Sequence, residues 1–119
     1  MVLIDAPAAT HDATRAFWGG VTGTEPDVGE SGTYANVGTL GGGIKLETQR
    51  LGSNDDTARV HLDVEADDVD AEVARLVGLG ATVLERTDDW VVLRDPAGLL
   101  FCVVPVWTDG FADHAVTWP

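Results

Sequence analysis

Glu47 and His61 are the two side chains of this sequence best suited to proton transfer or to metal binding. A general base needs a carboxylate or an imidazole within hydrogen-bond reach of the substrate proton. Glu47 lies in residues 45–49 and His61 in residues 60–64, two segments that we expect to be strands with one polar face. We therefore name Glu47 as the candidate catalytic base, and His61 with Glu47 as the candidate metal ligands.

Other polar side chains share the expected strand faces of these two residues. Strict alternation places Asp63 beside His61, on the face away from the apolar residues of the same strand. Lys45 and Gln49 flank Glu47 in the same way, and the fixed charge of Lys45 would compete with a metal for the carboxylate. The alternative interpretation is the wet face of an edge strand, with His61 making an ordinary hydrogen bond.

Residues on later and neighbouring strands complete the candidate set. Trp90 and Arg94 share one strand face, and an aromatic wall beside a cation suits a flat or anionic ligand, although a core tryptophan fits the pattern as well. Both His11 and His114 are interpreted as surface residues. The full candidate set for a ligand cleft is Tyr34, Lys45, Glu47, Gln49, His61, Asp63, Trp90, Arg94 and Cys102.

The elements that position these residues are read most clearly between residues 59 and 105. We expect strands at 60–64, 81–85, 90–94 and 99–104, with the last buried on both faces, and a helix after the first of them. Asp67 or Asp68 caps this helix and Gly80 ends it, while the sequence Asp95-Pro-Ala-Gly98 is a strong turn signal.

The first half of the chain repeats this order less clearly. We expect strands at 2–5, 33–37 and 43–49, and a polar loop without regular structure at 25–32. A helix capped by Thr10 should run to about Val21, with its buried side formed by Ala13, Ala16, Phe17 and Gly20. Shifting one half onto the other by 58 positions pairs Asp5 with Asp63, and the element types also coincide.

Composition limits the classes of function. The chain has 119 residues and a formal net charge of −13, so it should be repelled by phosphate backbones and anionic lipid, and we expect neither nucleic-acid nor membrane binding. The same charge would attract a cationic ligand. A single cysteine, Cys102, and the absence of an export signal favour a cytoplasmic protein.

The order of elements and motifs resembles the vicinal oxygen chelate superfamily, the glyoxalase, bleomycin-resistance and extradiol-dioxygenase group. The resemblance rests on a histidine early in a strand (His61), an acidic cap seven residues later (Asp68), the pair Leu79-Gly80, and Asp95-Pro-x-Gly before the last strand. It covers nearly the whole chain. It implies an α+β fold in which two tandem βαβββ modules form a curved mixed sheet around a cleft, with the helices outside.

The resemblance also implies a divalent metal (Zn, Ni, Mn or Fe) held by ligands from the first, fourth, fifth and eighth strands. His61 matches the fifth-strand ligand and Glu47 the fourth. The first-strand position falls on Met1 or Leu3, which cannot bind a hard cation, and the eighth-strand position is Cys102. We therefore expect no cofactor, or at most a weakly bound metal.

These observations predict a single glyoxalase-like domain, with module one at about 1–51, module two at about 58–106 and an apolar tail at 107–119. The expected function is binding of a small molecule, cationic or aromatic, at a degenerate metal site. The alternatives are a metal-dependent lyase, isomerase or dioxygenase-type enzyme, and a partner-binding module. The tail should pack on its own domain or on a second subunit of a homodimer.

Overall fold

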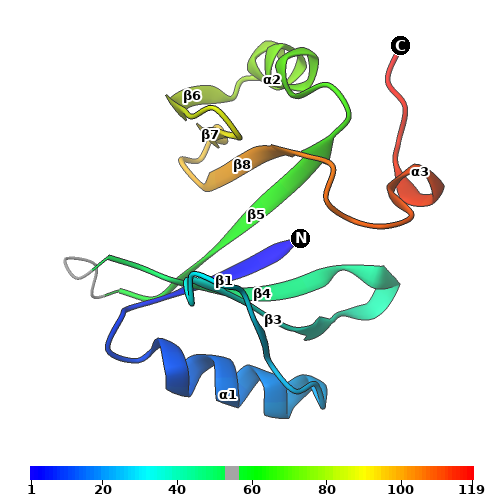
Figure 1. Ribbon diagram of the computed structural model, residues 1–119. Helices are drawn as coiled ribbons and strands as arrows, with labels where there is room; N and C mark the ends of the chain where they lie inside the picture. Colours follow the sequence, from blue (N-terminus) through cyan, green and yellow to red (C-terminus); the bar gives the residue numbers. More distant parts are fainter. Residues whose placement is uncertain (53–56) are drawn as a thin grey trace. The chain divides into compact units, whose positions relative to one another are not determined.

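The computed structural model describes residues 1–52 and 57–119, which divide into two compact units, Met1–Asp63 and Val64–Pro119. The segment between the two expected modules, about 52–57, lies mostly outside these described residues. The first unit contains β1 (Val2–Ala6), α1 (His11–Thr22), β2 (Asp27–Val28), β3 (Tyr34–Thr39), the 3-10 helix η1 (Gly41–Gly43) and β4 (Lys45–Arg50). Strand β5 (Arg59–Ala66) begins in the first unit and ends in the second (Figure 1).

The second unit repeats the element order of the first. It contains α2 (Val69–Gly78), β6 (Thr82–Arg86), β7 (Val91–Arg94), β8 (Leu100–Pro105) and α3 (Phe111–His114). Hydrogen bonds link the strands in the order β2-β3-β4-β1-β5 in the first unit and β5-β8-β7-β6 in the second. Strand β1 is parallel to β4 and antiparallel to β5, so the predicted α+β class, mixed pairing and βαβββ repeat are confirmed.

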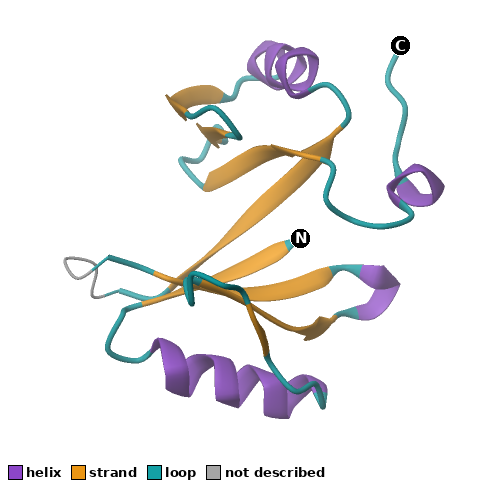
Figure 2. Ribbon diagram, viewed as in Figure 1, coloured by secondary structure: helices purple, strands orange, loops and turns teal. Residues whose placement is uncertain are grey.

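In the first unit, α1 lies along one face of the strands (Figure 2) and packs on β3 and β4. Its apolar core consists of Ile4, Val37 and Leu46, with Val2 and Trp18 packed against them. The segment predicted to be an irregular loop contains β2, a two-residue strand paired with β3. Two residues are too few to show a period, and this explains why the strand was missed.

The predicted buried side of α1 is wrong. Phe17 is 63% exposed, and Ala13, Ala16 and Gly20 are also exposed. The helix instead buries His11, which is 1% exposed and was interpreted as a surface residue, together with Gly19. The reason is a polar partner on the sheet, because His11 Nε2 lies 3.1 Å from the hydroxyl of Thr48, which is itself fully buried.

Glycines allow α1 to lie close to β3 and to the loop that follows the helix. A Cβ atom on Gly38 would lie 2.7 Å from the side chain of Thr22, and a Cβ on Gly19 would lie 2.7 Å from the carbonyl oxygen of Thr24. The Thr22 hydroxyl donates to the carbonyl of Val37 on β3. A larger side chain at Gly38 would push the helix off β3, and one at Gly19 would displace the loop that follows the helix. Thr10 does not cap the helix through its side chain, whose hydroxyl bonds Pro7 instead.

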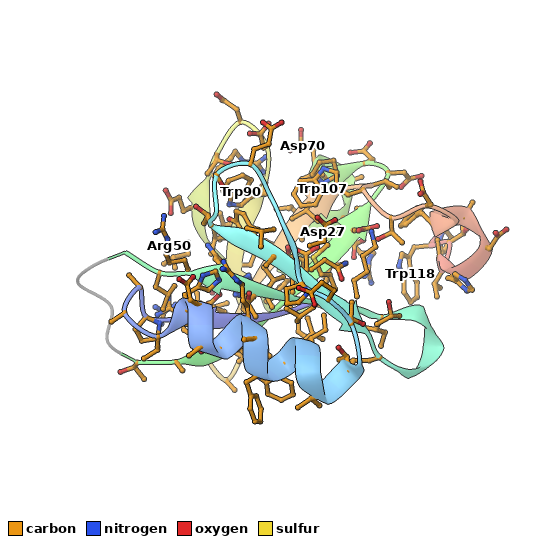
Figure 3. The ribbon with its side chains drawn as sticks, turned by 60° about the horizontal axis from the view of Figure 1, so that its bottom comes forward. Asp27, Arg50, Asp70, Trp90, Trp107 and Trp118 are labelled. Atoms are coloured by element: carbon orange, nitrogen blue, oxygen red, sulfur yellow. The ribbon has the colours of Figure 1, made fainter. Side chains whose placement is uncertain are left out.

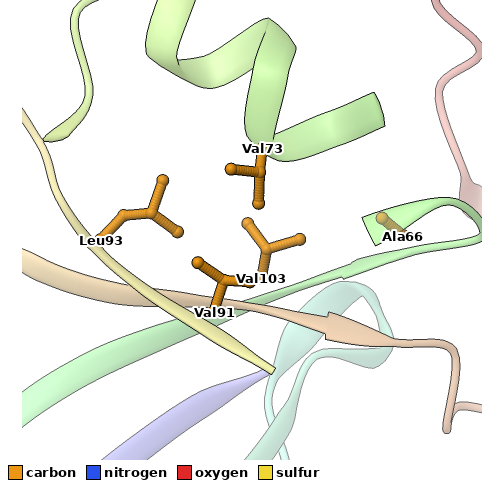
Figure 4. Packing of buried hydrophobic residues seen from close by; sticks show 5 residues of the cluster. All are labelled: Ala66, Val73, Val91, Leu93 and Val103. Atoms are coloured by element: carbon orange, nitrogen blue, oxygen red, sulfur yellow. The ribbon is translucent and has the colours of Figure 1, made fainter. Parts of the chain in front are cut away.

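The core of the second unit lies between α2 and the strands β7 and β8. Figure 4 shows Val73 of α2 above Val91, Leu93 and Val103, with Ala66 at the end of β5. Leu93 and Val103 are completely buried. In contrast to the prediction of a strand buried on both faces, the first half of β8 is only half-buried.

The predicted caps and turns of the second unit are confirmed. The Asp68 carboxylate accepts from the amide of Ala71 at the start of α2, and Gly80 has a positive φ of 110° after its end. Asp95 accepts from the amides of Ala97 and Leu99 across the predicted turn. These signals are local in sequence, which is why they could be read without the fold.

The tail packs on its own unit at two points. Both the amide and the hydroxyl of Thr108 bond the carboxylate of Glu65, the latter at 2.6 Å. Near the chain end, the ring of Trp118, labelled in Figure 3, stacks on Arg75 of α2 with 4.3 Å between guanidinium carbon and ring centre. None of the helices formed by the described residues is long and apolar enough to span a bilayer.

Replacing His11 by glutamine should make the protein less sensitive to acid. Burial, assisted by the charge of Arg15, lowers the pKa of His11 from 6.5. The unfolded chain therefore takes up this proton first, so the stabilisation is complete above pH 6.5 and is lost as the pH falls below it. Urea unfolding at about pH 7.5 and about pH 5 measures the free energy of unfolding. Its decrease between the two pH values should be smaller in His11→Gln than in wild type. His114→Gln, at an exposed site, should show the same decrease as wild type.

Candidate functional site

The face of the first unit opposite α1 is polar, and the strand register arranges it in two rows. One row runs across β3, β4, β1 and β5 as Tyr34, Gln49, Asp5 and Arg59. The neighbouring row, in the same strand order, is Asn36, Glu47, Leu3 and His61. Directly paired residues point to the same side of a sheet, so the structure brings most of the predicted candidates onto one face.

At one end of the row that begins with Tyr34, a hydrogen bond joins the first two side chains. Gln49 Nε2 donates to the Tyr34 hydroxyl at 3.2 Å. Lys45, Glu47 and Gln49 are half-buried and alternate with the buried Leu46 and Thr48, which confirms the predicted polar face of this strand.

At the other end of this row, the carboxylate of Asp5 is surrounded by charged side chains, and its own side chain is only 3% exposed. His61 Nδ1 donates to Asp5 Oδ2 at 2.9 Å, and Arg59 Nε donates to the same oxygen at 3.2 Å. Asp63 Oδ1 lies 3.4 Å from His61 Nε2, within ion-pair range but without hydrogen-bond geometry. The imidazole is therefore held between two carboxylates.

This arrangement changes the acid–base character of His61. Burial alone lowers the pKa of an imidazole, but the hydrogen bond to Asp5 and the negative charges of Asp5 and Asp63 outweigh burial and raise the pKa of His61 to about 9. At neutral pH the ring is an imidazolium, a donor at both nitrogens. A protonated imidazole cannot accept a proton as a general base, nor can it bind a metal.

Two carboxylate oxygens beside this imidazolium lack hydrogen-bond partners. Among the residues that the structure describes, Asp5 Oδ1 and Asp63 Oδ1 are buried and accept no hydrogen bond. Leaving a buried acceptor unsatisfied costs about 1–3 kcal/mol. The two oxygens belong to side chains on the same sheet face, so a molecule with suitably spaced donors would satisfy both.

Three predicted candidates belong to the second unit. Val92 pairs with Cys102 and Arg94 pairs with Leu100, and because Val91, Leu93 and Val103 face α2, Arg94 and Cys102 face the other way. Trp90 directly precedes β7 and is half-buried. The prediction that these residues line one cleft with Glu47 and His61 remains a prediction.

Asp5 and Arg59 were missed as site residues. Asp5 could have been recognised from its residue type. It is the one charged residue in a strand of otherwise apolar side chains, and it pairs with Asp63 in the 58-residue repeat. Arg59 is recognisable only from its register opposite Asp5, 54 positions away along the chain.

Replacing Asp5 by asparagine should lower the pKa of His61 and destabilise the first unit. The raised pKa means that the stabilisation by protonated His61 is complete below pH 6.5 and is lost as the pH rises through about 9. We expect Asp5→Asn to cost about 1–3 kcal/mol at neutral pH. Titration of the His61 ring by NMR should give a midpoint near 9 in wild type and in the control Asp88→Asn, and a lower midpoint in Asp5→Asn. A wild-type midpoint near 6.5 would contradict the described cluster.

Comparisons with known proteins agree with this fold. A family model described as a glyoxalase-like domain matches residues 1–104, so the tail lies outside the match. No curated protein matches the chain. Among solved structures, a Mn(II)-bound glyoxalase from Novosphingobium aromaticivorans is similar with a TM-score of 0.59 and 27% identity over 87% of this chain. The chain spans 37% of the length of that glyoxalase.

Two further structures are similar along their whole length. One is described as an NAD-dependent benzaldehyde dehydrogenase from Legionella pneumophila, with a TM-score of 0.61 and 14% identity over 90% of this chain and 100% of the other. The other is a glyoxalase/bleomycin resistance protein/dioxygenase superfamily member from Vibrio splendidus 12B01, with a TM-score of 0.56 and 14% identity over 89% and 98%. At such identities these likenesses concern the fold alone. With the family match across residues 1–104, the chain belongs to the glyoxalase-like domain family of the vicinal oxygen chelate superfamily.

Proposed function

We propose that this protein binds a small organic cation on the polar face of its first unit, without a chelated metal. The observation that carries the proposal is the pair of buried acceptors, Asp5 Oδ1 and Asp63 Oδ1, on either side of His61. A ligand with N–H donors, such as an ammonium or amidinium group, would supply the missing hydrogen bonds. Charge-assisted hydrogen bonds of this kind are the stronger ones.

Electrostatics favours a cation over a neutral donor. Within the cluster, Arg59 and protonated His61 balance Asp5 and Asp63, so the site itself is close to neutral. The rest of the chain provides the field, because its formal net charge is −13. Tyr34, 39% exposed in the row that contains Asp5, adds an aromatic ring on the same face, and aromatic rings attract cations.

The residues at the positions of the family's metal ligands do not fit a chelated metal. Strand register places Leu3 directly between Glu47 and His61, so the first-strand position is Leu3 and carries no donor atom. Leu3 is 2% exposed, and an aliphatic side chain stands where an ion would need a ligand. His61 would also have to release a proton that Asp5 and Asp63 hold. We therefore assign no chemical step to a metal.

The second candidate function is a metal-dependent lyase, isomerase or dioxygenase-type enzyme acting on a carbonyl or vicinal-oxygen substrate, with Glu47 as base. It is favoured by the 27% identity to a glyoxalase that binds Mn(II). The distance of 3.4 Å between His61 Nε2 and Asp63 Oδ1 is also one that two ligands of a single ion have. Metal content separates the two candidates.

Benzamidinium, benzamide and benzoate, three probes of nearly equal shape, test the cation proposal. A ligand that binds only the folded state raises the melting temperature by mass action, so at millimolar concentration benzamidinium should raise it more than the neutral and anionic probes. Asp63→Asn should remove the shift because it removes one acceptor charge. Asp88→Asn changes an exposed carboxylate of the second unit and should retain it. Equal shifts for all three probes, or a full shift in Asp63→Asn, would contradict the proposal.

Metal analysis of the purified protein tests the enzyme candidate. We expect Zn, Ni, Mn and Fe well below one equivalent, and no rise in melting temperature on adding these ions, because the row of Glu47, Leu3 and His61 offers a donor at only two of its three positions. One equivalent of metal in wild type that is absent from His61→Ala would overturn the metal-independent proposal in favour of the enzyme.

A further inference from the structure

Arg59 places a guanidinium group on the same carboxylate that the proposed ligand would bind. It is the first residue of β5 and pairs with Asp5 of β1. Its Nε donates to Asp5 Oδ2 at 3.2 Å, while Asp5 Oδ1 accepts no hydrogen bond from the residues that the structure describes. An arginine and a carboxylate often pair through two parallel hydrogen bonds that use both oxygens. Here Arg59 bonds only one of the two oxygens that a cationic ligand would use.

The two donors to Asp5 Oδ2 differ in how firmly they are held. His61 Nδ1 lies 2.9 Å from this oxygen, and the His61 side chain is only 12% exposed. The contact of Arg59 is longer, and its side chain is 46% exposed. An ion pair with so exposed a partner contributes little to stability, because water competes for the guanidinium. Arg59 is thus the donor that a ligand cation can replace at Asp5.

The charge of Arg59 also opposes a cationic ligand. The site contains two carboxylates, Asp5 and Asp63, and two cations, His61 and Arg59. Without the guanidinium, two negative charges would face one positive charge, and the site would attract a cation directly. A like charge within a few ångströms of a ligand weakens its binding about ten-fold even where water screens most of the repulsion.

We infer that Arg59 is a built-in competitor of the ligand, because its guanidinium occupies the position of the ligand's cationic group at Asp5 and weakens binding there. The inference rests on the proposed function, since it concerns the same carboxylate. It also specifies the class of ligand. The group that already binds Asp5 is a planar cation with several N–H donors. The ligand should therefore carry an amidinium or a guanidinium group, and not a quaternary ammonium, which has no N–H to donate.

A purely structural role of Arg59 predicts the opposite effect on binding. If the guanidinium served to orient Asp5 for the ligand, its removal would weaken binding. Asp5 is also held without Arg59, by the hydrogen bond from His61 and by its place in β1, which pairs with strands on both sides. Loss of the guanidinium should therefore leave the carboxylate in place and open Oδ2 to the ligand.

Calorimetric titration with benzamidinium tests the inference. Arg59→Gln removes the charge from a long polar side chain, and the dissociation constant should fall about ten-fold relative to wild type. Arg59→Lys restores a positive charge and should return the dissociation constant most of the way to the wild-type value. Arg50→Gln is the matched control, because it makes the same change to the net charge of −13 on the opposite face of the sheet, and it should bind as wild type does.

The sign of the change decides between competition and positioning. Weaker or unchanged binding by Arg59→Gln, in a preparation where wild type binds benzamidinium, would overturn the inference and leave the proposed function standing. Circular dichroism checks that each variant folds. Arg59→Ala is a second neutral variant, and either folded one suffices for the comparison.

Ethylguanidinium provides a measurement that does not depend on benzamidinium. It has the shape of the group that Arg59→Ala removes. At millimolar concentration it should raise the melting temperature of Arg59→Ala more than that of wild type or of Arg50→Ala, because a ligand of the folded state stabilises it by mass action. If benzamidinium binds none of the proteins, the proposed function fails and ethylguanidinium alone decides the inference. Equal effects of ethylguanidinium on all three proteins would then overturn it.

Discussion

A charged group inside a sheet has to be neutralised by its neighbours, and in the first unit this requirement falls on the carboxylate of Asp5. Its partners Arg59 and His61 come from the adjacent antiparallel strand. A shift of β5 by one residue would turn both partners to the opposite face of the sheet and leave the carboxylate buried without compensation. The electrostatics of one side chain thus selects the register of β1 and β5, and that register determines which residues share the polar face.

The two sides of this sheet therefore carry side chains of different kinds. On one side, the rows through Asp5 and Leu3 collect carboxylates, an imidazolium, an amide and a phenol. On the other side, the alternate residues of the same strands are aliphatic and meet α1. Alternation along each strand is sufficient to separate a polar face from an apolar face within the same sheet.

Much of this architecture could be predicted from the sequence because its signals are local. The cap at Asp68, the turn at Asp95 and the alternation around His61 all lie within a few residues of the structure they specify. The candidate site was only partly predictable. Residues Glu47, His61 and Asp63 stand out by type, whereas the role of Arg59 follows from a pairing that joins positions 54 apart.

Helix α1 shows where local reasoning fails. Its sequence allows two buried sides, one through Phe17 and one through His11, and hydrophobicity favours the first. The fold takes the second because His11 meets the hydroxyl of Thr48 on β4, and because Gly38 of β3 leaves room for Thr22 of the helix. The apolar side through Phe17 is left exposed.

The position of Leu3 has an evolutionary consequence. It separates two potential ligands, Glu47 and His61, in an otherwise complete row across three strands. A leucine codon that begins with cytosine becomes a histidine or glutamine codon when its second base changes to adenine. One base change of this kind would thus place a third donor between Glu47 and His61 without rebuilding a strand.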